Sequence, residues 1–231
     1  SLGNAGSLGP GSVQWMTAGS GILHQEMPKG DAAGRMHGFQ LWANLPSGKK
    51  MTSPRYQDIA GADIPEYGDD DGTLVRLITG DWRGERGPVD GIAADPQYLD
   101  VTVPPGVRKV IPIDAYRSAF AYVFEGEASF RDASEPVGVL VEKEVGGREL
   151  HLRDMSGDRT MVAFDSGDEI VVRAGENGVR FLLVSGRPIR EPVAWQGPIV
   201  MNTEEEIRQA MTDLQNGSFI RESADGRVGT T

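Results

Sequence analysis

Glycine and proline divide this chain into short segments, and that division limits the folds it can adopt. The sequence holds 31 glycines and 14 prolines in 231 residues, which favours many turns and short strands over long helices. Leu99, Val101 and Val103 alternate with polar residues, as in a half-buried strand. The sequence therefore predicts an all-β fold, with strand-length apolar runs at residues 13–16, 22–27, 37–45, 73–79, 98–103, 119–124, 128–130, 160–164, 169–173 and 179–184.

A polar, turn-rich stretch separates two groups of these runs. We expect part of a first β-domain at residues 1–53, a linker at 54–72, a second β-domain at 73–200, a helix at 201–217 and a mobile tail at 218–231. The linker ends in Asp69, Asp70, Asp71 and a glycine. We expect these aspartates in a solvated loop rather than a calcium site, because the wider spacing of an EF-hand is missing.

The sequence N-T-E-E-E-I-R-Q-A-M-T-D-L-Q-N-G predicts the helix. Thr203 can cap its first turn, and Glu206, three residues later, completes a capping box. Asn216 and Gly217 supply the stop. We expect one apolar face at i, i+3, i+4 and i+7, made by Ile207, Ala210, Met211 and Leu214.

Charge and cysteine content exclude several classes of function. The formal net charge is −11, and no dense Lys/Arg cluster offsets it, so direct nucleic-acid binding is disfavoured. No apolar run approaches the length of a membrane span, and the absence of cysteine fits a soluble cytoplasmic protein. Any metal must be held by His, Asp, Glu or water. The chain begins with Ser1, so we expect a processed, tagged or truncated N-terminus.

His24 and Glu26 are the residues whose spacing points to chemistry. On a strand, residues i and i+2 project to the same face, so an imidazole and a carboxylate would converge. Such a pair suits a divalent first-row metal, but two ligands are too few. A hydrogen bond from His24 to Glu26 or to a carbonyl accounts equally for the spacing, and spacing favours it about two to one. Both interpretations stay open at this point.

Longer segments carry a more specific signal. The chain contains P-G-S-V-Q-W-M-T-A-G-S-G-I-L-H-Q-E-M-P, then H-G-F-Q-L-W-A-N-L-P and Y-Q-D-I, and later R-P-I-R-E-P-V-A-W-Q-G-P-I-V-M-N-T-E-E-E-I-R-Q-A. In this order the segments resemble the pirin family. The resemblance implies a bicupin: two cupin-type antiparallel β-barrels with a C-terminal helix, and one divalent metal, usually iron, in the N-terminal barrel.

The resemblance also implies a ligand set. His24 and Glu26 would be two of four metal ligands, and the other two are histidines of an H-x-H motif that precedes the matching stretch. This chain contains no H-x-H, so we expect an incomplete N-terminal barrel. His37 would be structural, His151 a surface loop residue, and the second barrel free of metal. We assign Trp15, Met16 and Trp42 to packing.

Two functions follow from the resemblance. The first is a metal-dependent dioxygenase of the quercetinase type, acting on flavonols such as quercetin, with Glu26 as both ligand and base. The alternative is a redox-sensing or regulatory protein that binds a protein partner through the metal-bearing barrel without turnover.

Overall fold

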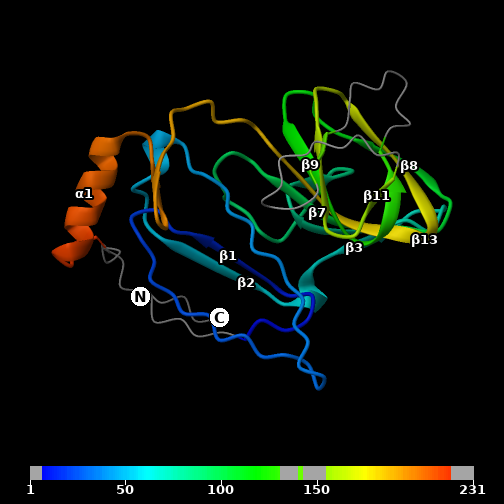
Figure 1. Ribbon diagram of the computed structural model, residues 1–231, viewed down its shortest axis with the longest axis horizontal. Coiled ribbons are helices and arrows are strands. Elements are labelled where there is room, and N and C mark those ends of the chain that lie inside the picture. Colours follow the sequence, from blue (N-terminus) through cyan, green and yellow to red (C-terminus); the bar gives the residue numbers. More distant parts are fainter. Residues whose placement is uncertain (1–6, 131–139, 143–154, 220–231) are drawn as a thin grey trace. The chain divides into compact units, whose positions relative to one another are not determined.

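The computed structural model describes residues 7–130, 140–142 and 155–219. It divides into two compact units (Figure 1). Among the described residues, unit 1 contains Gln14–Gln57 together with residues 189–219, and unit 2 contains Leu8–Val13 and most of Asp58–Pro188. The described secondary structure is almost entirely strand, with one α-helix near the C-terminal end, so the predicted all-β fold is confirmed.

Unit 2 is built on a nine-stranded antiparallel sheet. Seven strands follow one another in the order β10-β12-β9-β13-β7-β4-β3, while β11 pairs with β9 and β8 pairs with β13. The strands are β3 (Glu66–Gly68), β4 (Leu74–Thr79), β7 (Gln97–Val103), β8 (Arg108–Pro112), β9 (Ser118–Ser129), β10 (Leu140–Glu142), β11 (Ser156–Gly157), β12 (Thr160–Phe164) and β13 (Glu169–Gly186). A separate short hairpin joins β5 (Asp81–Trp82) to β6 (Glu85–Arg86).

The alternating residues of β7 form the centre of the core. Leu99, Val101 and Val103 are fully buried, and Leu99 and Val101 lie opposite Leu183 and Phe181 of β13. Asp100, between Leu99 and Val101, was expected to face solvent and does not. Asp100 is only 7% exposed, because Arg180 donates two hydrogen bonds to its carboxylate, at 2.9 and 2.6 Å. A buried carboxylate is tolerated when it is paired in this way.

The two longest strands, β9 and β13, bend together. The predicted runs 119–124 and 128–130 form the single strand β9, and the runs 169–173 and 179–184 form the single strand β13. The β9–β13 register shifts between Ala174 and Val179. The bend requires glycine at Gly126, whose φ is +71°. A Cβ there would lie 2.1 Å from the carbonyl oxygen of Gly178, closer than any side chain tolerates. Because the strand continues past the bend, β13 pairs first with β8 and then with β7.

Unit 1 has less regular structure. β1 (Val13–Thr17) pairs with β2 (Arg55–Ile59), and β14 (Ala194–Gln196) pairs with β15 (Ile199–Met201). Residues 22–27 and 37–45 are not strands, so that prediction is wrong for both runs. Apolar content favours a strand, but a strand also needs a partner backbone, and neither run has a ladder partner among the described residues. Residues 54–72, expected as a linker, carry β2, a short 3₁₀ helix (η2, Gly61–Asp63) and β3.

The helix α1 (Glu204–Gln215) begins as predicted. Thr203 accepts a hydrogen bond from the Glu206 backbone, and the Glu206 side chain accepts one from the Thr203 N–H, so the capping box is confirmed. Ile207 and Ala210 are buried against β14 and β15, with Met211 packed beside them. Leu214 is 42% exposed, so its assignment to the packed face is wrong. The last turn of the helix leaves that residue outside the cluster of Ala194, Ile199, Met201, Ile207 and Ala210.

Residues 189–202 bind back to residues 44–50 within unit 1. The Glu191 carboxylate accepts hydrogen bonds from the backbone N–H of Ser47 at 2.6 Å and from its hydroxyl at 3.2 Å. Asn202 donates a third, at 3.0 Å. The hydrogen bond from the Ser47 N–H lowers the pKa of Glu191 most, and the bonds from the Asn202 amide and the Ser47 hydroxyl lower it further. Desolvation of the Glu191 carboxylate acts in the opposite direction but is outweighed. These bonds start a short 3₁₀ helix, η1 (Ser47–Lys49).

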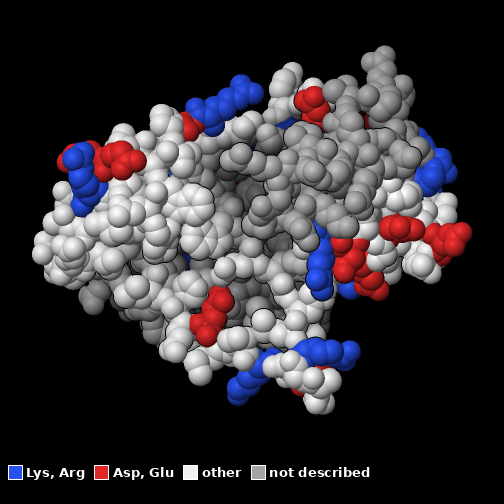
Figure 2. Space-filling model, in the orientation of Figure 1, with Lys and Arg blue, Asp and Glu red and all other residues white. Residues whose placement is uncertain are grey.

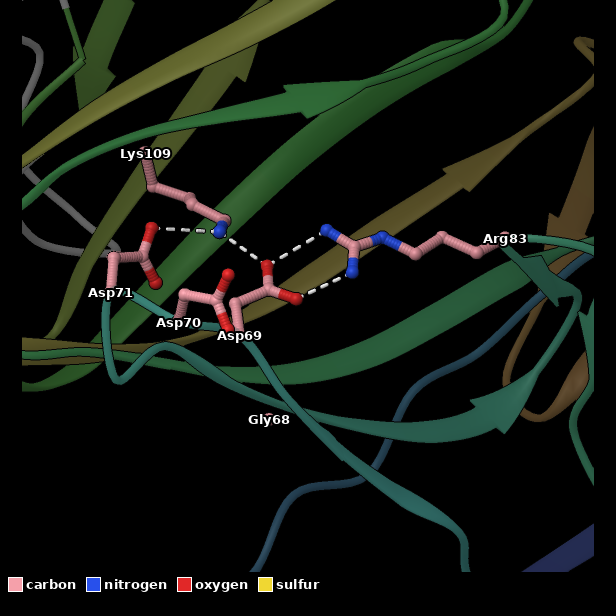
Figure 3. A pocket seen from close by; sticks show the side chains of 6 residues that line it. All are labelled: Gly68, Asp69, Asp70, Asp71, Arg83 and Lys109. Atoms are coloured by element: carbon pink, nitrogen blue, oxygen red, sulfur yellow. Dashed lines mark hydrogen bonds and ion pairs between the residues drawn. The ribbon is translucent and has the colours of Figure 1, made fainter.

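The aspartates before β4 are not a simple solvated loop. Lys109 of β8 contacts both Asp69 and Asp71, the latter at 2.8 Å (Figure 3). Arg83, from the β5–β6 turn, donates to Asp69 at 2.8 Å. Burial alone would raise the pKa of Asp71, but Lys109 and Thr73 outweigh it and lower that pKa to about 2. Asp70 and Asp71 stay exposed, as expected, while Asp69 is partly buried. The prediction missed this network because its cations come from distant parts of the sequence.

Replacing Thr203 by Ala tests the helix start. The change removes the acceptor for the Glu206 N–H and should destabilise α1 by about 1 kcal/mol. Amide hydrogen exchange over residues 204–215 measures the effect. Thr212→Ala is the matched control, because Thr212 lies inside the helix and its hydroxyl donates only to the Arg208 carbonyl. Equal acceleration of exchange in both variants would contradict the capping role.

Replacing Lys109 by Met tests the ion-pair network. Two carboxylates would lose a buried cation, and we expect a loss of about 2 kcal/mol in unfolding free energy at pH 7, less than for a fully buried pair because Asp71 is partly exposed. A carboxyl whose pKa is lowered on folding stabilises the native state above its unfolded pKa and loses that effect as pH falls toward the folded value. The difference between wild type and variant should therefore shrink between about pH 4 and pH 2.

Chemical denaturation at several pH values measures this difference. Lys49→Met, at an exposed lysine, is the control and should change the unfolding free energy little. A Lys109→Met effect that stays constant down to pH 2 would show that lost packing, not the ion pairs, accounts for it.

Candidate functional site

His24 and Glu26 lie on an extended segment of unit 1 that follows a tight turn. The Ser20 N–H donates to the Thr52 carbonyl at 2.9 Å, and the Gly21 N–H closes the turn on Ala18. Gly21 has a φ of +125°, and a Cβ there would lie 2.5 Å from Cε1 of Phe219. Glycine is therefore required at this position by both its backbone and its neighbour. Phe219 follows α1, so the end of the chain's helix contacts the turn that leads to His24.

The structure brings the two predicted site residues together. His24 Nε2 lies 3.6 Å from Glu26 Oε1, and the side chains are 45% and 64% exposed. The segment is not a strand, yet its two side chains approach each other as the i, i+2 spacing predicted. At 3.6 Å the pair is too long for a hydrogen bond and short enough for both groups to approach one ion.

Gln40 also reaches this site, and the sequence analysis did not single it out. Its Nε2 donates to Glu26 Oε1 at 3.3 Å, across fourteen positions in the sequence. Both His24 and Gln40 therefore approach the same carboxylate oxygen, and Oε2 has no hydrogen bond within the described residues. Gln40 lies inside H-G-F-Q-L-W-A-N-L-P, one of the segments that carried the family resemblance. The family resemblance of that segment was the sequence signal that could have pointed to Gln40.

Neither of the other two histidines joins the candidate pair among the described contacts. His37 contacts the ring of Phe39, with ring centroids 5.1 Å apart. His151 is not among the described residues.

Several large apolar side chains near this segment in sequence are exposed. Trp42, which the sequence analysis assigned to packing, is 59% exposed, so that assignment is wrong. Trp15 and Met16 of β1 are half-buried rather than fully enclosed. Within residues 22–51 the exposed set consists of Leu23, Met27, Met36, Phe39, Trp42 and Met51.

The donor set fits a divalent first-row metal in kind but not in number. Imidazole nitrogen and carboxylate oxygen are ordinary ligands for such ions. Within residues 7–130, 140–142 and 155–219, however, no three His, Cys, Asp or Glu side chains are placed to hold a metal ion. His24 and Glu26 can therefore supply part of a coordination shell, and further protein donors or water would have to complete it.

The pocket lined by Gly68, Asp69, Asp70, Asp71, Arg83 and Lys109 is a weaker candidate. Its two cations already neutralise Asp69 and Asp71 (Figure 3). These ion pairs stabilise the loop between β3 and β4. Of the charged residues that line the pocket, Asp70 is left without an ion pair within the described part of the chain. His24 and Glu26 remain the stronger site.

Surface charge and helix length are relevant to whether the chain could bind nucleic acid or cross a membrane. On the face drawn in Figure 2, Lys and Arg side chains of the described residues are dispersed in small groups, most of them near Asp or Glu. The helix in the described part of the chain is too short to cross a membrane.

Comparison with known proteins places this chain in a family. A family model for pirin matches residues 1–43, and a model for the pirin C-terminal cupin domain matches residues 98–220. A pirin-like protein of Caulobacter vibrioides is 42% identical over 218 residues, covering 94% of this chain and 71% of that protein. Human pirin is 36% identical over 216 residues, covering 93% of this chain and 67% of that protein.

A solved structure extends the comparison to the fold. The crystal structure of quercetin 2,3-dioxygenase from Acinetobacter baumannii matches with a TM-score of 0.76 at 30% identity, covering 95% of this chain and 71% of that one. The two family models match in their expected order, the second over more than half of the chain, and the segment with His24 and Glu26 lies inside the first. The chain therefore belongs to the pirin family and has its cupin fold.

Proposed function

We propose that this chain is the greater part of a metal-dependent dioxygenase that oxidises flavonols such as quercetin. The observation that carries the proposal is the convergence of His24 Nε2 and Glu26 Oε1 to 3.6 Å. The likeness to the Acinetobacter enzyme supports the substrate class. The metal, for which iron is our first choice, would bind and polarise the substrate's hydroxyl and ketone oxygens.

The chain's own residues would contribute binding and proton transfer. His24 would be a neutral imidazole ligand. Glu26 would bind the ion and accept the proton of the substrate hydroxyl, because a carboxylate with one oxygen engaged by Gln40 keeps another available. The other two protein ligands would be the histidines of the family's H-x-H motif, which this sequence does not contain.

The exposed apolar side chains in residues 22–51 favour a second candidate function. Trp42, Phe39 and Met27 expose large apolar surfaces in the same segment of unit 1 as His24 and Glu26. Such surfaces are typical of protein interfaces. A regulatory protein that captures a protein partner only when its metal is bound would account for them. Flavonol turnover with oxygen uptake distinguishes the enzyme from this alternative.

Iron content provides the first test. Two protein ligands give a weak site, because water replaces the missing donors without the advantage of a preformed chelate. The 231-residue chain should therefore lose its iron on dialysis and show little quercetin oxidation. A longer form that carries an H-x-H segment before residue 1 should retain about one iron per chain, by the same chelate argument, and consume oxygen with quercetin.

Variants in the longer form assign the ligands. His24→Ala and Glu26→Gln should each remove the retained iron, while His37→Ala, a matched histidine change, should leave it in place. Near-stoichiometric iron on the dialysed 231-residue chain would contradict the proposal, because other residues would then complete the site.

A further inference from the structure

Glu26 is held from a second segment of unit 1. Gln40 Nε2 donates to Glu26 Oε1 at 3.3 Å, and the two residues lie in extended segments that share no strand ladder. Without that bond the exposed Glu26 side chain could rotate among several rotamers, most of which point away from His24. We propose that Gln40 is a positioning residue that fixes the Glu26 carboxylate beside His24. The inference rests on the proposed function, since it assumes that Glu26 binds the metal.

The chemistry of the amide suits this role. A carboxylate offers two oxygens with several acceptor sites, and the amide of Gln40 occupies one of them on Oε1. Gln40 is neutral, so it orients the carboxylate without cancelling the charge that attracts a cation. Oε2 makes no hydrogen bond in the part of the chain that the structure describes, and it stays open to an ion or a substrate proton. Mutation of residues that orient metal ligands in this way typically lowers metal affinity by about 10- to 100-fold.

The chain contains a matched control for this proposal. Gln25 precedes Glu26 directly and carries the same exposed amide, but it contacts Met27 Sδ at 3.4 Å instead of the carboxylate. The contact with Met27 engages the Gln25 amide away from the Glu26 carboxylate. Gln25→Met and Gln40→Met remove the same donor group from exposed positions, but only Gln40→Met removes a contact with Glu26.

A first measurement needs no metal. In NMR spectra of the 231-residue chain, Glu26→Gln should shift the side-chain amide signals of Gln40 and leave those of other distant glutamines unchanged. Gln40→Met should leave the backbone amide signals of β9, β13 and α1 in place, which shows that the variant is folded. Unchanged Gln40 side-chain signals in Glu26→Gln would overturn the proposal, because the two groups would then not be in contact.

A second measurement uses Co²⁺ as the probe. Titration of the same chain to millimolar Co²⁺ should broaden the signals around His24. Gln40→Met should raise the dissociation constant about tenfold and alter the visible absorption of the bound Co²⁺, whereas Gln25→Met should do neither. His24→Ala and Glu26→Gln should abolish the broadening.

The outcomes separate this inference from the function on which it rests. If His24→Ala and Glu26→Gln abolish Co²⁺ binding while Gln40→Met matches Gln25→Met, the positioning role is overturned and the metal site stands. If neither His24→Ala nor Glu26→Gln changes Co²⁺ binding, both proposals are overturned.

Discussion

Contacts between residues 14–57 and 189–219 hold together the part of the molecule that carries His24 and Glu26. The first segment has little regular structure, so its conformation depends on side-chain contacts more than on a strand ladder. Glu191 accepts from Ser47, and Phe219 contacts the turn at Gly21. Residues 189–219 are therefore part of the support of the candidate site.

The two units use different means to order their backbones. Unit 2 relies on β9 and β13, two long strands whose ladder brings β7, β8 and β12 into one sheet around a buried core of aliphatic and aromatic side chains. Ion pairs of Lys109 with Asp69 and Asp71 then link β8 to the loop between β3 and β4. Unit 1 combines a small apolar cluster with hydrogen bonds from carboxylates and amides. The site lies in the unit with the smaller core, where single hydrogen bonds such as that of Gln40 have more influence on geometry.

Local features were predictable from the sequence, and features that depend on distant residues were not. The capping box was found because Thr203 and Glu206 lie within one turn of each other. The Asp69–Asp71 network was missed because Lys109 lies forty positions away from Asp69. The strand predicted at residues 22–27 failed for the same reason, since apolar content is local and strand pairing is not. His24 and Glu26 were found through family resemblance and i, i+2 spacing, but their partner Gln40 is visible only in the folded chain.

The separation of unit 1 into two stretches of sequence has a consequence for how the protein is made. Residues 58–188 leave the ribosome as a continuous stretch and can assemble most of their sheet before residues 189–219 have been synthesised. Residues 14–57 are synthesised before them and must wait for the contacts that residues 189–219 make with Ser47 and Gly21. That order lets unit 1 form only after most of the unit 2 sheet, and during that interval residues 14–57 lack their stabilising contacts and are open to capture by chaperones.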